Sequence, residues 1–101
     1  MTMTLQVAYP ATEGTRFDYD YYFGTHMKMV EDHMGAHIAE AFATRGVSGP
    51  PGQPAPFHAI ATMKFADQAA LNEALGASGP VMEDIPNFTD CAPQILIGQI
   101  G

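Results

Sequence analysis

A tyrosine and a histidine of the sequence are spaced so that they could act together as an acid–base pair. His26 follows Tyr22 by four residues, about one helical turn, so in a helix the phenol and the imidazole would share a face and could form a hydrogen bond. Imidazole titrates near neutral pH, and a neighbouring phenol can orient or polarise it. The pair predicts proton transfer next to a carbonyl or an aromatic hydroxyl. The alternative is that His26 only caps a kinked helix.

Two further histidines have the spacing of metal ligands. His33 and His37 are four residues apart, which would bring them together on one helix. Gly35 lies between them and is expected to end the helix, so no metal site is expected. The sequence has no glycine-rich phosphate loop, nucleophile elbow, Cys-x-x-Cys pair or dinucleotide fingerprint. No cofactor is therefore expected.

Methionines and aromatic residues provide side chains that could line a pocket for an apolar ligand. Thioethers and rings fill irregular space around hydrophobic molecules, although ordinary core packing is the alternative for each residue. An acidic residue at position 84 precedes a turn-prone segment, where it could either make the turn or gate a pocket. The expected pocket residues are Tyr9, Tyr21, Met27, Phe42, Phe65, Asp84 and Phe88.

Alternating apolar and polar side chains predict the strands that must position these residues. The alternation is clear over residues 3–9 and 57–65. A weaker alternation predicts a strand over residues 37–47. Residues 94–100 carry apolar side chains on both faces and are predicted to form a buried strand.

Capping residues and glycines predict the helices. Asp18 can cap a first helix, with the preceding phenylalanine packed on Tyr22, and Gly24 is expected to kink that helix. Asp67 can cap a second helix that ends near Gly76, and a short third helix is expected from residue 78. The elements then follow the order strand, helix, strand, strand, helix, strand. This is the order of a ferredoxin-like α+β fold with a four-stranded antiparallel sheet.

The length and the two-sided apolar strands predict how the chain is organised. At 101 residues the chain suits a single domain over residues 1–101, with the proline-rich segment 48–56 as a connection inside it. Both helices would cover one face of the sheet, yet apolar residues occur on both faces. We expect a second copy to cover the open face in a two-fold homodimer. The alternative is a monomer in which segment 48–56 folds over that face.

The composition limits which binding partners and which cellular location are expected. Apolar residues make up 47% of the chain and charged residues 15%, which predicts a folded and not a disordered chain. Eleven acidic against four scattered basic residues give a net charge of −7, so neither nucleic acid nor an anionic membrane is an expected partner. Cys91 has no cysteine to pair with, and the sequence starts without the pattern of a signal peptide. A cytoplasmic location is expected.

Three spaced segments carry a family resemblance. They are Tyr9-Pro10 at the end of the first strand, residues 17–27 at the start of the first helix, and residues 85–90 before the last strand. Together they resemble the EthD family, named for ethyl tert-butyl ether degradation, in the dimeric α+β barrel superfamily. The resemblance implies a homodimer with a cavity between the helices and the sheet of each subunit. The positions that match the family pattern are His26, Tyr21-Tyr22 and residues 87–90.

The resemblance and the acid–base pair together predict a function. We expect a protein that binds a small apolar or aromatic metabolite and acts as a cofactor-independent oxidoreductase, lyase or cyclase in an oxidative degradation or polyketide-like pathway. His26 would be the general acid or base, with Tyr22 orienting it and Tyr9 near the mouth of the pocket. The alternatives are a non-catalytic binding or accessory protein for a partner oxygenase, and a haem-binding protein with a histidine ligand.

Overall fold

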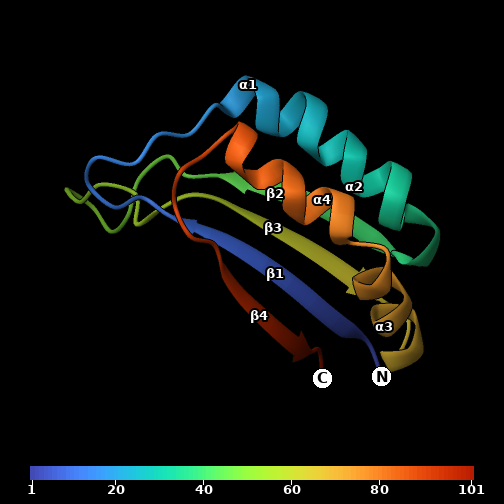
Figure 1. Cartoon of the computed structure of the whole chain (residues 1–101). Coiled ribbons are helices and arrows are strands. Elements are labelled where there is room, and N and C mark those ends of the chain that lie inside the picture. Colours follow the sequence, from blue (N-terminus) through green and yellow to red (C-terminus); the bar gives the residue numbers. More distant parts are fainter.

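The chain folds into two layers, a four-stranded sheet and a layer of helices on one of its faces (Figure 1). The structure, a computed structural model, describes all 101 residues. The strands are β1 (Met3–Pro10), β2 (Glu40–Arg45), β3 (Phe57–Phe65) and β4 (Gln94–Gln99). The helices are α1 (Tyr19–Tyr21), α2 (Met27–Met34), α3 (Gln68–Gly76) and α4 (Gly79–Asp84), joined or extended by a π-helical turn, η1 (Tyr22–His26), and two 3-10 turns, η2 (Gly35–His37) and η3 (Ile85–Asn87).

The sheet has the strand order β2-β3-β1-β4, and all neighbouring strands are antiparallel. This arrangement confirms the ferredoxin-like α+β fold expected from the sequence. The two central strands, β1 and β3, place every second side chain against the helices, as their period-two patterns predicted. These side chains form the floor of a core of 16 buried apolar residues.

The first helix begins and bends where the sequence predicted. The Asp18 side chain accepts a hydrogen bond from the backbone N–H of Tyr21 at 3.1 Å, and the ring of Phe17 packs 5.0 Å from that of Tyr22. The expected kink takes the form of the π-helical turn η1, in which the N–H of Met27 bonds to the carbonyl of Tyr22. This turn buries Tyr22 and His26 and leaves Gly24 exposed.

The second helical segment also follows its local signals. The Asp67 side chain accepts a hydrogen bond from the N–H of Ala70 at 2.9 Å, which confirms the predicted cap of α3. Helix α3 ends at Gly76, and α4 begins directly after Ser78. None of the helices has the length and the apolar composition that a membrane span requires.

Two strand predictions were wrong in detail. Strand β2 starts at Glu40 and not at residue 37, because the chain first completes the 3-10 turn η2. Strand β4 is not buried. It forms an edge of the sheet that the helices do not cover, and its side chains are mostly exposed in the single chain (Figure 1).

The face of the sheet opposite the helices carries a mixed apolar surface. Strand register places Phe42, Thr62, Gln6 and Leu96 in one row across this open face, with Ile60 in the next row. Phe42 and Leu96 are 44% and 59% exposed. Phe42 therefore lies on the far side of the sheet from the helices, and the prediction that it lines a pocket beneath them was wrong.

Candidate functional site

A cavity lies between the helical layer and the inner face of the sheet. Its volume is about 110 Å³, and 13 of its 15 lining residues are hydrophobic. The two polar lining residues are His26 and Ser78. Strand β1 contributes Tyr9 to the wall, and helix α2 contributes Met27 and Val30. Such a cavity suits an apolar ligand that is held in place by very few polar contacts.

The lining residues of the cavity differ in their exposure to solvent. Leu75, Met82 and Ile95 line it and are 37%, 39% and 51% exposed, which places the opening between α3, α4 and the edge strand β4. Tyr9 and His26 line the cavity as well, but they are only 1% and 3% exposed. Tyr9 is therefore a buried part of the cavity wall, and the prediction that it lies near the mouth was wrong.

His26 is held by a buried carboxylate. The Nδ1 atom of His26 lies 3.0 Å from Oδ2 of Asp84, which comes from the end of helix α4. The other carboxylate oxygen, Oδ1, accepts hydrogen bonds from the Tyr21 hydroxyl at 2.6 Å and from Nδ2 of Asn87 at 2.9 Å. Asp84 thus accepts three hydrogen bonds, which is how a buried carboxylate is stabilised.

The surroundings of His26 and Asp84 determine the protonation state of each side chain. Burial alone would raise the pKa of Asp84, but the hydrogen bonds from Tyr21, Asn87 and His26 outweigh it and hold this pKa below its usual value. Burial lowers the pKa of His26, and the neighbouring carboxylate only partly opposes this effect. The imidazole is therefore neutral at pH 7. Because an ionised carboxylate can only accept, the proton lies on Nδ1 and the lone pair on Nε2.

Tyr22 does not orient His26 through a hydrogen bond, so this prediction was wrong. The two rings are nearly parallel, with centroids 5.6 Å apart and an angle of 18°. The Tyr22 hydroxyl is buried and has no hydrogen-bond partner. The four-residue spacing correctly brought the rings together, but they stack and form no hydrogen bond. Asp84, 58 residues away in the sequence, takes the orienting position instead.

The other predicted pocket residues fall into different places. Met27 lines the cavity, whereas Tyr21 does not and instead donates a hydrogen bond to Asp84. Phe88 is fully buried with its ring centroid 4.5 Å from that of His26, so it packs behind the histidine. Phe65 is buried at the end of β3 and is not part of the cavity wall.

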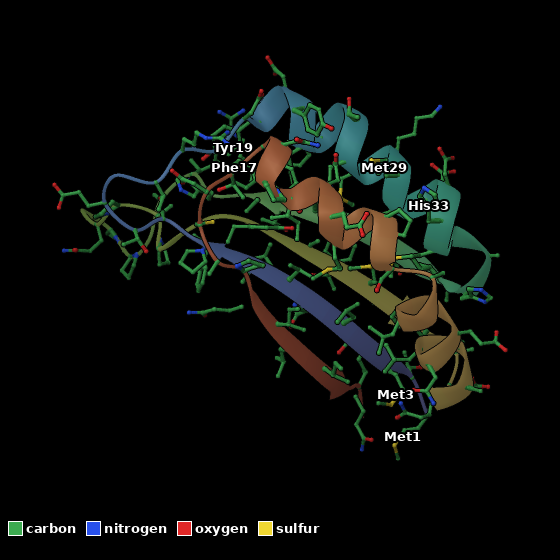
Figure 2. The ribbon with its side chains drawn as sticks, viewed as in Figure 1. Met1, Met3, Phe17, Tyr19, Met29 and His33 are labelled. Carbon is green, nitrogen blue, oxygen red and sulfur yellow. The ribbon has the colours of Figure 1, made fainter.

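The segment before β4 mainly clamps the start of the first helix. The Thr89 hydroxyl donates to the carbonyl of Arg16 at 2.7 Å, and Asp90 accepts from the Arg16 N–H at 2.9 Å. The N–H of Asp18 bonds to the carbonyl of Phe88 at 2.8 Å. These contacts fix the entry to α1 (Figure 2, near Phe17 and Tyr19). The segment is therefore a structural turn, and only Asn87 reaches the carboxylate.

The remaining histidines do not form a second site with His26. His33 is exposed on α2, as Figure 2 shows. His37 lies in the 3-10 turn η2, where its Nδ1 is 3.1 Å from a carboxylate oxygen of Glu73.

Sequence reasoning missed Asn87 as a partner of Asp84 and Ser78 as a lining residue. Neither has a spacing to His26 that would have revealed it.

Comparisons with known proteins agree with this architecture. The family model of the EthD domain matches residues 12–92. The chain belongs to the EthD family. An EthD-like protein from Ralstonia eutropha is 33% identical, with a TM-score of 0.87 over 97% of this chain and 90% of that chain. No curated protein matches the sequence.

More distant structures share the fold. An EthD family protein from Bacillus halodurans is 20% identical, with a TM-score of 0.78 over the full length of both chains. SnoaB from Streptomyces nogalater, described as a cofactor-independent oxygenase, is 9% identical, with a TM-score of 0.63 over 98% of this chain and 91% of that chain. At these identities the likeness concerns the arrangement of helices and strands.

The two adjacent tyrosines are expected to respond in opposite ways to the loss of their hydroxyls. Tyr21→Phe removes a hydrogen bond to a charged group and should lower the free energy of unfolding. Tyr22→Phe removes a buried hydroxyl without a partner, so stability should stay the same or rise by about 1 kcal/mol. Urea denaturation of both variants measures the difference. A Tyr22→Phe variant that is less stable than Tyr21→Phe would contradict the network.

The His26 ring is expected to titrate below pH 6.5, the ordinary value for imidazole. Asp84→Asn should lower the pKa of His26 further, because the carboxylate favours the charged ring. NMR shifts of the ring carbons across the acidic range measure both values. As the pH falls below 6.5, the His26 ring of the unfolded chain takes up a proton before that of the folded protein does. The free energy of unfolding should therefore decrease in this range, and the decrease should be smaller in His26→Gln. An upward shift in Asp84→Asn would show that the carboxylate does not act on His26.

Proposed function

We propose that the chain binds a small apolar or aromatic metabolite in the cavity and that His26 acts on it as a general base or acid. The observation that carries the proposal is the position of a neutral, carboxylate-oriented histidine in the wall of an apolar cavity. Nδ1 is occupied by Asp84, so Nε2 is the nitrogen left for a ligand. In this arrangement Asp84 is a positioning residue, and Tyr21 and Asn87 hold Asp84.

The arrangement suits proton transfer at a carbon or oxygen atom of the ligand. Nε2 would accept the proton, and Asp84 would stabilise the imidazolium that forms. The buried carboxylate fixes the tautomer and the ring orientation before the ligand arrives, which lowers the reorganisation that the reaction needs. Proton transfer of this kind is a step shared by cofactor-independent oxidoreductases, lyases and cyclases. A role in oxidative degradation is consistent with EthD membership and with the fold shared with SnoaB.

Ligand uptake by the cavity can be tested with phenol as the probe. Phenol should bind to the wild-type protein, and Ala61→Leu should weaken binding at least tenfold, because Ala61 lines the cavity and a larger side chain fills it. Ala69→Leu, on the exposed side of α3, is the matched control and should bind as the wild type does. Isothermal titration calorimetry measures the affinities. Equal affinities of the two variants would place phenol elsewhere.

Catalysis and simple binding differ in their response to a change at His26. Native mass spectrometry of freshly purified protein, with an absorbance scan, should identify a small organic molecule that remains bound. His26→Gln should keep that molecule within a few-fold in affinity but lose its conversion. Conversion that is unchanged in His26→Gln would remove the histidine from the mechanism. Binding without conversion in the wild type would favour the accessory role for a partner oxygenase.

We also propose that the chain forms a homodimer through the open face of the sheet. Support comes from the exposed Phe42 and Leu96 in one row of that face and from the dimeric state that the EthD resemblance implies. The cavity lies on the opposite side of the sheet, so a partner on the open face would leave it accessible.

The dimer predicts a strong effect of a charge on the open face. Leu96→Lys should raise the dissociation constant about a hundredfold or more, because an unpaired ammonium would be buried in both subunits. Val47→Lys, in the exposed loop after β2, adds the same charge outside that face and is the control. Sedimentation velocity at several concentrations measures the dissociation. A wild-type protein that sediments as a monomer would overturn the dimer.

A further inference from the structure

The four tyrosine hydroxyls of the chain differ in whether they form a hydrogen bond within the protein. Tyr19 and Tyr21 are hydrogen-bonded, to Nδ1 of His58 at 3.3 Å and to Asp84 at 2.6 Å. Tyr9 and Tyr22 are the two buried tyrosines. The Tyr22 hydroxyl is fully enclosed without a partner, and the structure shows no hydrogen bond of the Tyr9 hydroxyl. Only Tyr9 of these two lines the cavity. Buried phenols normally have a hydrogen-bond partner. Because the Tyr9 hydroxyl has none within the protein, it is free to bond to a ligand.

The polar groups of the cavity wall offer a ligand one donor and two acceptors. His26 offers the lone pair of Nε2. Ser78 donates its hydroxyl proton to the carbonyl of Leu75 at 2.7 Å and so offers only lone pairs. Tyr9 is the one side chain of the wall with a proton to donate. A complementary ligand therefore has an oxygen acceptor together with a hydrogen that a base can remove.

Tyr9 and His26 lie close to the same two rings. The Tyr9 ring centroid is 5.5 Å from the centroids of both Tyr22 and Phe88. The His26 ring is 5.6 Å and 4.5 Å from the same two rings. Both residues line the cavity and are buried. A small ligand in the cavity could therefore reach the phenol and the imidazole.

We propose that Tyr9 donates a hydrogen bond to a carbonyl oxygen of the ligand, and that the substrate class of the cavity is small enolisable ketones and aldehydes. This inference rests on the proposed role of His26 as a base. In the step, Nε2 of His26 takes a proton from the carbon next to the carbonyl. The C–H electron pair forms the carbon–carbon double bond, and the carbonyl π electrons move to the oxygen, where the Tyr9 hydroxyl stabilises the enolate. Return of the proton to carbon restores both groups.

The environment of Tyr9 suits a donor and not a base. Burial raises the pKa of Tyr9, and the nearby Tyr22 and Cys91 add to this effect, so the phenol stays protonated. A protonated donor and a neutral base in one cavity are the combination that stabilises an enolate without a metal ion.

The size of the cavity limits the reacting part of the ligand. An engineered apolar cavity of about 150 Å³ holds a benzene molecule, and the cavity described here has about 110 Å³. Cyclopentanone and phenol are both of about the size of benzene, so either would fill the cavity and extend to its open end. A larger substrate would have to leave its remaining atoms at the mouth, against Leu75, Met82 and Ile95.

The test uses cyclopentanone, whose α-hydrogens exchange slowly in neutral D₂O. Loss of the α-hydrogen NMR signal should be faster with the wild-type protein than in buffer. Tyr9→Phe keeps the ring and should slow the protein-dependent exchange by at least tenfold, since the loss of one enolate donor commonly costs about a hundredfold. Tyr19→Phe makes the same chemical change outside the cavity and should exchange at the wild-type rate. His26→Gln should abolish the protein-dependent exchange.

The outcomes separate this inference from the function on which it rests. Exchange that is unchanged in Tyr9→Phe would overturn the donor role and leave His26 as the base. No acceleration by the wild-type protein would overturn the enolisable carbonyl class, and phenol binding then decides separately whether the cavity takes ligands. As a second readout, Tyr9→Phe should bind cyclopentanone at least about threefold more weakly and cyclopentane equally well, because only the ketone accepts a hydrogen bond. Equal losses for both ligands would indicate a change in cavity shape and would also overturn the donor role.

Discussion

The Asp84 carboxylate is buried, and the helical layer is organised around its hydrogen bonds. A buried charge that loses its partners destabilises a protein by several kcal/mol. Its three donors come from three different elements: Tyr21 from α1, His26 from η1 and Asn87 from η3. The long helical segment α1–α2 and the shorter α4 must therefore lie side by side over the sheet, as they do in Figure 1. The same bonds that hold this layer together fix the ring of His26 in the wall of the cavity.

The π-helical turn makes this arrangement possible within one helical segment. It directs Tyr22 and His26 into the core, while the three residues between them remain exposed. Turns of this kind are rare and often occur at functional sites, because they give up regular helix bonding for a particular side-chain direction. Gly24 indicated a bend at this place in the sequence. Its type depends on contacts with distant residues, namely the bond from His26 to Asp84 and the packing against Phe88.

Local sequence patterns correctly predicted those features of the fold that depend only on residues close together in the chain. Strand β3 and the caps at Asp18 and Asp67 follow from alternation and capping chemistry, which act over a few residues. The pairing of His26 with Asp84 spans 58 residues, and an acidic residue before a turn has an ordinary local explanation. Phe42 shows another limit. The period of two separates the faces of β2 correctly, but it cannot tell which face meets the helices when both are apolar, and the structure places the small alanines inside.

The two faces of strand β1 keep the two proposed interactions apart. Leu5, Val7 and Tyr9 point into the cavity, whereas Gln6 and Ala8 belong to the open face. Because a strand alternates strictly, a change on one face leaves the side chains of the other in place. Ligand chemistry and self-association can then vary independently on one backbone. This independence offers a physical reason why proteins with as little as 9% identity keep the same arrangement of elements. The backbone pattern preserves the fold, and the residues around the cavity determine the chemistry.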